Sequence, residues 1–547
     1  MPVIETQLDT QSEAYSRNRA FMLEYVQRIR DVEARIQATE EAYRPRAEKR
    51  GKLLPRERLA ALLDPGSPFI ELSSIGGYKM YGDTDGSTAG GNLICGIGMV
   101  SGRRTAVLVW NYAVKGGTIN AVTTRKHLRL QEICFQNRLP TVSLSESGGG
   151  DLAGSGTNQD PWGAAGFLDG GRVYCQQAEL SAAGLPQVIV AHGNATAGGA
   201  YHVGLSDYIV LVRGKSQFFL AGPPLLKAAT GEVATAEALG GAEMHARISG
   251  TGEYLAEDDG DGVRVAREIL AQLPPDPQVP GDQVGDAPLY PEEELLGVVS
   301  ADKRVPFDIR EVIARIVDGS RFLDFQSEID PYMVCGHCHI FGRRVGIIGN
   351  NGPITPAGAK KAAQFIQLCD QSQTALLFLH NTTGFLVGVD VEEKGQVKHG
   401  SKMIQAVANT RCPKISIGVG NSYGAGNYAM CSRSLRPHFI FSWPTSRVAV
   451  MGGAQARKVI EIVTTEKMAA KGIEPDAETL KLIAAQGETI EAGLETISES
   501  MYCSARIMDD GLIDPRDTRR VIGFCLDTIA EGRARPQAPF GFGVQRL

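Results

Sequence analysis

Two short runs of small residues stand where an apolar stretch gives way to an expected helix. The first, TAGGAY at residues 196–201, follows the apolar run QVIVAHG, and the second, YGAGNY at 423–428, follows ISIGVG. The first turn of a helix leaves backbone N–H groups without partners, and small residues let an anionic oxygen reach them. Such groups can form an oxyanion hole, which stabilises charge that develops in a transition state. The candidate catalytic residues are Gly198, Gly199, Ala200, Gly424, Ala425 and Gly426.

A purely structural role is the alternative for either turn, because glycine also permits a tight connection between a strand and a helix. The presence of two such turns favours chemistry in which two carbonyl-type oxygens gain negative charge. Two further turns, at 147–150 and 382–385, stand one apolar stretch earlier in each half. The strand ends of a parallel sheet share one edge, so these turns should border the same cleft. They supply the candidate substrate-binding residues Gly148, Gly149, Thr383, Gly384 and Phe385.

The elements that position these turns occur twice along the chain. Each half has, in the same order, an apolar run after Gly-Arg-Arg, a helical stretch, and buried-type strands that end in the glycine turns. The same offset of 231 residues separates Asp207 from His438 and Gly222 from Gly453. Ordered similarity of this kind indicates a duplicated βα unit. Continuous apolar strands that alternate with helices predict an α/β fold, with each sheet covered on both faces.

We expect four segments in the chain. Residues 1–50 form an N-terminal helical extension, since apolar residues recur there at helical spacing among many charges. That helix is either solvated at the surface or used in subunit packing. Residues 51–272 and 296–547 form the two repeated domains. The segment 273–295 between them is rich in proline and is predicted to be a linker, because proline interrupts both helices and central strands.

Composition excludes several classes of protein. The 547 residues carry 56 Lys plus Arg against 62 Asp plus Glu, so there is no overall attraction for nucleic acid or anionic lipid. No apolar stretch is long enough to span a membrane, and the N-terminus lacks the pattern of a secretory signal, which predicts a cytoplasmic protein. Cys335 and Cys338 form one C-x-x-C pair without a second pair nearby, so no metal site is expected.

Several motifs resemble those of one family. They are GKLLPRERLAALLDPGSPFIELS at 51–73, FLAGPPLLKAATGE at 219–232, NTTGFLVG at 381–388 and MGGAQA at 451–456. Together with the rest of residues 15–545 they resemble the carboxyltransferase (β) subunits of biotin-dependent acyl-CoA carboxylases, in the 3-methylcrotonyl-CoA and geranyl-CoA branch. The resemblance implies two crotonase-like (ClpP/crotonase) domains. It also implies an active site between the N-terminal domain of one subunit and the C-terminal domain of another.

The same resemblance implies the partners and the cofactor. The β subunits of this family form a hexamer within a complex of six α and six β subunits. The α subunit carries the biotin carboxylase and the biotin carboxyl carrier domain. The present chain has no biotin-attachment motif, so the biotin is expected on that partner, and a coenzyme A thioester is expected as the substrate.

The resemblance also assigns roles to the turns. Gly198, Gly199 and Ala200 would hold the thioester oxygen, and Gly424, Ala425 and Gly426 would hold the ureido oxygen of biotin. Carboxybiotin would release carbon dioxide, its ureido nitrogen would take the γ proton of the enoyl thioester, and the resulting dienolate would attack the carbon dioxide. This chemistry demands no side-chain base. Candidates for binding the CoA phosphates are Lys115, Arg125, Lys126 and His127, for which a solvated helix face is the alternative.

The segment 151–171 is where the chain departs from the methylcrotonyl type. That type carries an aromatic residue just before the Gly-Arg that matches 171–172, and here Gly170 stands in its place. A small residue in an acyl pocket leaves volume for a longer tail, whose burial stabilises the complex by ~0.8 kcal/mol per CH₂. We therefore expect a geranyl-CoA-like substrate, with 3-methylcrotonyl-CoA as the alternative. The segment could instead be a surface loop unrelated to the pocket.

Three other functions are weighed against this one. A crotonase-like hydratase or isomerase needs a carboxylate base beside a single oxyanion hole, and it leaves the second hole unexplained. A non-catalytic scaffold has no need for glycine turns in both halves. A decarboxylase subunit of a sodium pump would run the same half-reaction in reverse with a membrane partner.

Overall fold

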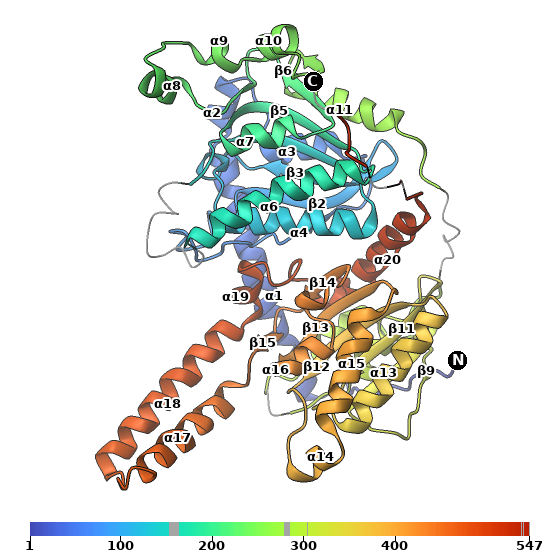
Figure 1. Ribbon diagram of the computed structural model, residues 1–547. Helices are drawn as coiled ribbons and strands as arrows, with labels where there is room; N and C mark the ends of the chain where they lie inside the picture. The colour runs from blue at the N-terminus through green and yellow to red at the C-terminus, as the bar shows by residue number, and fades with distance from the viewer. Residues whose placement is uncertain (152–162, 278–284, 303–304, 538, 540, 546–547) are drawn as a thin grey trace. The chain divides into compact units, whose positions relative to one another are not determined.

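The computed structural model describes residues 1–151, 163–277, 285–302, 305–537, 539 and 541–545. Contacts divide the chain into two compact units (Figure 1). Unit 1 comprises residues 1–29, 280–504 and 508–526, and unit 2 comprises 30–279, 505–507 and 527–547. The predicted proline-rich linker includes 278–284, which lie outside the described residues.

The predicted N-terminal helix is confirmed as α1 (Glu13–Ala42), which contributes to both units. Apolar residues at helical spacing give α1 one buried stripe, which consists of Met22, Val26, Ile29, Val32 and Ile36. Two short helices follow, α2 (Arg44–Lys49) and α3 (Pro55–Leu62), each with proline in its first turn. The rest of α1 is largely exposed, so it is a surface helix with one buried stripe, and its use in subunit packing stays a prediction.

Unit 2 is built on a sheet that has eight strands among the described residues. They are β1 (Ile70–Leu72), β2 (Leu93–Val100), β3 (Arg103–Trp110), β4 (Thr141–Ser147), β5 (Gln187–Thr196), β6 (Tyr208–Val212), β7 (Gln217–Phe219) and β8 (Tyr254–Ala256). Their order is β1-β2-β3-β4-β5-β6-β8, and β7 pairs with the end of β5. Pairing is antiparallel from β1 to β3 and parallel from β3 onward.

Helices cover both faces of this sheet. After α3, the helices of this unit are α4 (Ala121–Asn137), α6 (Gly163–Ala182), α7 (Gly198–Gly204), α8 (Pro223–Thr230), α9 (Ala236–Gly240), α10 (Ala242–Met244) and α11 (Asp259–Gln272), of which α8 has no buried residue. Figure 1 shows α4 and α6 along one face. On the other face α3 and α11 bury a cluster with strand valines such as Val142, Val190 and Val210. These continuous valine runs are what strands with two covered faces require.

Unit 1 repeats the plan with seven strands among the described residues. They are β9 (Leu323–Asp324), β10 (Met333–Ile340), β11 (Arg343–Asn350), β12 (Ala375–Thr382), β13 (Lys414–Tyr423), β14 (Phe439–Ser442) and β15 (Arg447–Ala449). The order is β14-β13-β12-β11-β10-β9, and β15 pairs with β13. The helices are α12 (Ile309–Ala314), α13 (Pro356–Gln371), α14 (Val389–Glu393), α15 (Gln396–Asn409), α16 (Gly424–Ala429), α17 (Gly453–Ala469) and α18 (Ala477–Ser498). Two more helices, α19 (Ser500–Ala505) and α20 (Thr518–Ala534), begin in unit 1 and end in unit 2.

The two sheets share details that confirm the predicted duplication. In each, an antiparallel hairpin leads into parallel strands, and its turn contains a glycine with positive φ, Gly102 in one and Gly342 in the other. The strand register also shifts at matching places, between Ser145 and Ser147 and between His380 and Thr382. Both irregularities come directly before the glycine turns, so each sheet bends its strand ends at the same point. The predicted α/β class is confirmed.

Cys335 and Cys338 both lie in β10. Residues three apart on a strand point to opposite faces of the sheet, so these two sulfurs do not converge on one metal ion. No helix among the described residues has the length and apolar character needed to cross a bilayer.

Candidate active site

The first glycine turn joins β5 to α7. Ala197 has a φ of 53° and donates its N–H to the carbonyl of Phe219 at 3.1 Å. The next backbone bond of this turn runs from the Ala200 N–H to the Ala197 carbonyl at 3.0 Å. The N–H groups of Gly198 and Gly199 lie between these two and have no recorded partner among the described residues. They are the two free donors that an oxyanion hole requires.

The turn after β4 lies beside the end of β5. Gly149 has a φ of 89°, and a Cβ placed on it would lie 3.7 Å from the Thr196 carbonyl oxygen. Ser147 fixes this turn, because its hydroxyl accepts from the Gly149 N–H at 3.2 Å and donates to the Gly117 carbonyl at 2.7 Å. Gly148 donates its N–H to the Gly116 carbonyl at 3.0 Å. The two turns predicted in the first half therefore meet.

The second glycine turn joins β13 to α16. Gly424 has a φ of 56°, a conformation that favours glycine. At the end of α16 the Met430 N–H donates to the Gly426 carbonyl at 3.0 Å. The N–H groups of Ala425 and Gly426 thus have no recorded partner within the described part of the chain. This turn repeats the donor arrangement of the first one.

The turn after β12 is held against α16. Gly384 has a φ of 115°, its N–H donates to the Thr382 hydroxyl at 3.2 Å, and its carbonyl accepts from the Ile354 N–H at 2.9 Å. Thr383 is exposed at the turn. The Phe385 ring instead packs on α15, where a Cβ on Gly400 would lie 2.9 Å from it. The Phe385 ring therefore packs against the core cluster of this unit.

Comparisons with known proteins agree with this geometry. The family model described as "Carboxyl transferase domain" matches residues 46–540. The chain belongs to the carboxyl transferase family. The predicted family resemblance is thereby confirmed.

Three relatives show how closely this carboxyltransferase follows known ones. It is 44% identical over 541 residues to the probable biotin-dependent acyl-coenzyme A carboxylase beta2 subunit of Mycobacterium tuberculosis, covering 98% of this chain and 99% of the relative. It is 45% identical to the biotin-dependent 3-methylcrotonyl-coenzyme A carboxylase beta1 subunit of the same organism, covering 93% of each. The crystal structure of the geranyl-CoA carboxylase beta subunit of Pseudomonas aeruginosa is 54% identical, with a TM-score of 0.91 and full coverage of both chains.

Sequence reasoning missed a buried charge cluster beside the turn at 147–150. The fully buried Arg58 side chain contacts Glu146 at 2.9 Å and Asp259 at 2.7 Å, and Lys52 also pairs with Glu146. Burial opposes a charge on Asp259, but the His192 imidazole 3.3 Å away and the Arg58 guanidinium hold its pKa well below the ordinary value. Because Glu146 directly precedes the turn at 147–150, this cluster anchors that turn.

The basic residues proposed to bind the CoA phosphates differ in how far they are exposed to solvent. Lys115 is exposed, and its ammonium donates to the Tyr81 carbonyl. Lys126 is only 2% exposed and donates to the Gly90 carbonyl at 3.1 Å, and burial lowers its pKa. His127 is buried too, with its pKa well below the usual value because of that burial, while Arg125 is half-buried. Lys126 does not fit a phosphate contact, and the solvated-face alternative is wrong for it and for His127.

Gly170 lies in α6, where a Cβ would meet nothing within 4 Å. The position therefore has open space beside it, as an enlarged acyl pocket requires. Most of the distinctive segment at 151–171 lies outside the described residues, since 152–162 are not described.

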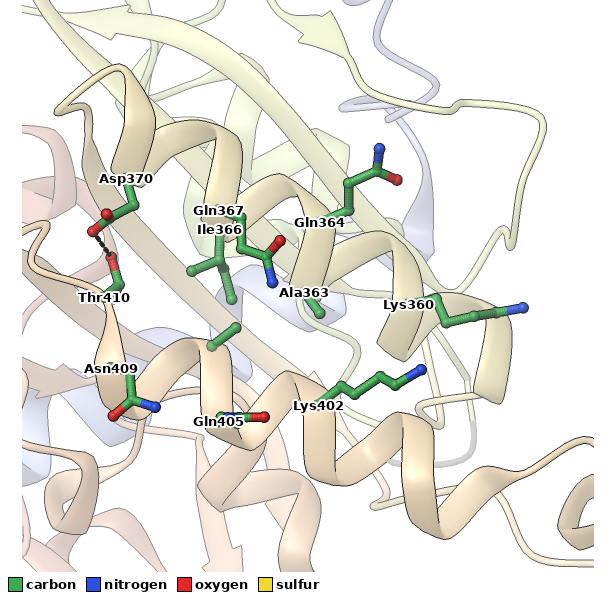
Figure 2. Close-up of a pocket in the computed structure, with 11 residues that line it drawn as sticks. Lys360, Ala363, Gln364, Ile366, Gln367, Asp370, Lys402, Gln405, Asn409 and Thr410 are labelled. Carbon is green, nitrogen blue, oxygen red and sulfur yellow. Dashed lines mark hydrogen bonds between the residues drawn. The ribbon is translucent and has the colours of Figure 1, made fainter.

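Two pockets in unit 1 differ in their relation to the site. One of about 510 Å³ lies between α13 and α15, with Lys360 and Lys402 at one end and the Asp370–Thr410 hydrogen bond at the other (Figure 2). It includes none of the predicted site residues. The other, of about 280 Å³, is lined by Thr383 and by residues at the ends of β12 and β13. It therefore adjoins the second half-site.

Proposed function

We propose that this carboxyltransferase is the β subunit of a biotin-dependent acyl-CoA carboxylase that carboxylates the γ carbon of a branched enoyl-CoA, with geranyl-CoA favoured. The observation that carries the proposal is the pair of strand-to-helix turns, each with two N–H groups that lack a recorded partner. The relatives support it, since two of them are named as biotin-dependent carboxylase β subunits. A hydratase would use only one such turn.

The proposed roles follow from the donors in each turn. The N–H groups of Gly198 and Gly199 hold the thioester oxygen, with Ala200 completing the turn, and stabilise negative charge as the γ proton leaves. Those of Ala425 and Gly426 hold the ureido oxygen of biotin, next to Gly424. Bound carboxybiotin supplies the carboxyl group and the ureido nitrogen that accepts the proton. Removing one donor of this kind from an oxyanion hole typically lowers kcat by about 10²- to 10³-fold.

The residues present fit a ureido group. Gly424 and Gly426 place no side chain beside the free N–H groups. The backbone of Gly384 lies directly against Gly426. A neutral ureido oxygen that gains negative charge needs donors and no cation, and the described residues of the turn offer backbone donors. The pocket of about 280 Å³ at Thr383 adds volume next to this half-site.

Geranyl-CoA is favoured for two reasons. The open space at Gly170 allows a tail longer than that of methylcrotonyl-CoA, provided that α6 lines the acyl pocket. The sequence identity is also higher to the geranyl-CoA carboxylase β subunit, at 54% over the whole of both chains, than to the 3-methylcrotonyl-CoA carboxylase β1 subunit, at 45% over 93% of each chain. The alternative acceptor is 3-methylcrotonyl-CoA.

The proposed assembly is a hexamer of this chain bound to six α subunits that carry the biotin. The test is an assay of the complex co-purified with its biotinylated partner, ATP and labelled bicarbonate. Geranyl-CoA, 3-methylcrotonyl-CoA and propionyl-CoA are compared. Highest kcat/KM with geranyl-CoA supports the whole proposal. A preference for methylcrotonyl-CoA retains the chemistry and rejects the substrate. No labelling of any acyl-CoA by a partner that becomes carboxylated rejects the function.

A further inference from the structure

Tyr174 occupies the space beside the first glycine turn. Its hydroxyl lies where a side chain on Gly198 would begin, since a Cβ built there would be 2.3 Å from Tyr174 Oη. Tyr174 comes from α6 and Gly198 from the start of α7, so the hydroxyl joins two elements at the mouth of the proposed oxyanion hole. A side chain on residue 198 would therefore have to displace the Tyr174 hydroxyl.

The Tyr174 hydroxyl is also available to a ligand. No hydrogen bond of this group is recorded among the described residues, although the side chain is half-buried. Burial, together with Tyr201 nearby, raises the pKa of Tyr174 above its ordinary value, so the phenol remains a neutral donor at physiological pH. A half-buried hydroxyl without a protein partner is normally satisfied by water or by a bound molecule.

A second ring extends this surface. The ring of Tyr201, in α7, lies 6.0 Å from that of Tyr174 at an angle of 65°, and it is 52% exposed. Edge-to-face pairs at this spacing are favourable and hold both rings in place. The two tyrosines therefore form an aromatic wall that starts at the glycine turn and opens toward the surface.

The wall continues toward Gly170. Gly170 and Tyr174 are four residues apart in α6, so they share one face of the helix and lie about 6 Å apart along its axis. The position of Gly170 has open space around it, whereas Tyr174 touches Gly198. A chain attached to a thioester at Gly198 would thus pass the Tyr174 ring before it reaches the space at Gly170.

We propose that Tyr174, supported by Tyr201, is a specificity-determining residue that forms the wall of the acyl channel and selects acyl-CoA substrates by the length of their apolar tail. This inference rests on the function proposed above, because it takes the first glycine turn as the thioester site. A short tail ends near Gly198 and gains little from the wall. A long tail lies along the ring and gains apolar contact.

The test uses the full complex with its biotinylated partner and two acyl-CoAs, geranyl-CoA and 3-methylcrotonyl-CoA. We expect Tyr174→Ala to raise KM for geranyl-CoA at least tenfold more than KM for methylcrotonyl-CoA. We expect kcat with methylcrotonyl-CoA to stay within about threefold, because the backbone donors are intact. Tyr174→Phe keeps the ring and should keep the wild-type ratio of the two KM values. The matched control is Tyr254→Phe, on the edge strand β8.

The outcomes separate this inference from the proposed function. A wild-type complex that carboxylates neither acyl-CoA rejects the function itself. An active wild type in which Tyr174→Ala changes both KM values by the same factor, or neither, overturns the role of Tyr174. If Tyr174→Ala fails to assemble, the exposed Tyr201→Ala replaces it. That variant should shift the KM ratio in the same direction by about threefold or more, and an unshifted ratio overturns the proposal.

Discussion

A Cβ atom on Gly426 would lie 2.8 Å from the Cα of Gly384. The turn after β13 and the turn after β12 are therefore in backbone contact, and residue 426 has no room for a side chain, while Gly384 adopts a φ of 115° that favours glycine. The same closeness holds the free N–H groups of α16 in one position relative to the end of β12. A preorganised donor costs no reorganisation when charge develops, which is where oxyanion holes gain their effect.

Gly426→Ala should therefore separate the two turns and abolish most activity. The added methyl group meets backbone, which cannot rotate away, so α16 must shift and its donors lose their alignment. We expect kcat to fall by about 10²-fold or more, the loss typical of one missing oxyanion donor. The measurement is carboxylation by the complex at saturating acyl-CoA.

The control for this variant is Gly493→Ala. Gly493 is exposed within α18, and a Cβ there meets nothing within 4 Å. Alanine in place of glycine within a helix stabilises it by about 0.5–1 kcal/mol, so this variant should be fully active and slightly more stable. Activity of Gly426→Ala equal to that of Gly493→Ala would contradict the role assigned to the second turn.

Gly198→Ala should show a loss that a second substitution repairs. The new methyl group meets the Tyr174 hydroxyl, which is the far end of a side chain. We expect kcat/KM for geranyl-CoA to fall about tenfold. Removing the hydroxyl relieves the clash, so the double variant Gly198→Ala with Tyr174→Phe should recover at least threefold. Purely additive losses in this double-mutant cycle would mean that the two residues are not in contact.

The positions of the glycine turns could be predicted from the sequence because their causes are local. Gly424 and Gly149 adopt positive φ values that favour glycine, and both follow apolar strands, so residue type and position carry the information. The duplication also supported the prediction, because a glycine turn expected in one half had a counterpart at the matching position of the other half. The family of the chain followed from the same motifs.

The partners of those turns could not be predicted, because they come from distant parts of the chain. Arg58 meets Glu146 across 88 residues and Asp259 across 201. Tyr174 reaches Gly198 only because α6 packs beside α7. Lys126 looked like part of a charged surface, yet the fold buries its stem and satisfies its ammonium with the Gly90 carbonyl. Charge in a sequence does not reveal which side of a helix faces the core.

Arg58→Met should destabilise unit 2 and weaken catalysis through the turn at 147–150. Removing one partner of a buried charge network leaves Glu146 and Asp259 without their main counter-charge, a change that typically costs about 3–5 kcal/mol. Urea denaturation of the purified chain should show a lower midpoint. Arg264→Met is the control, because its ion pairs with Asp261 and Glu268 lie at the surface, and its midpoint should hardly move. Equal midpoints for both variants would mean that the network adds nothing to stability.

Acid should destabilise the protein over the range from about pH 6.5 to about pH 4. Burial lowers the pKa values of His192, His202 and His380 to about 4, against an unfolded value of about 6.5. The unfolded chain binds more protons than the folded one between these values, so the stability these residues contribute is present above pH 6.5 and is lost as the pH falls. Asp509 acts in the opposite sense, because burial raises its pKa to about 6, and burial also raises the pKa values of Glu33 and Glu40. The buried His127, whose pKa burial holds well below its usual value, adds to the loss caused by the other histidines.

The measurement is the urea midpoint at pH 7.5, 6.0 and 5.0, for the wild type and for His202→Gln. The His202 ring bonds Ser143 at 2.9 Å and Gln177 at 3.0 Å, and the uncharged glutamine cannot titrate in its place. We therefore expect the variant to start less stable at pH 7.5 and to lose less stability between pH 7.5 and 5.0. A wild-type midpoint that rises toward pH 5.0 would contradict the burial of neutral histidines. A variant whose pH slope equals that of the wild type would exclude His202 as a contributor.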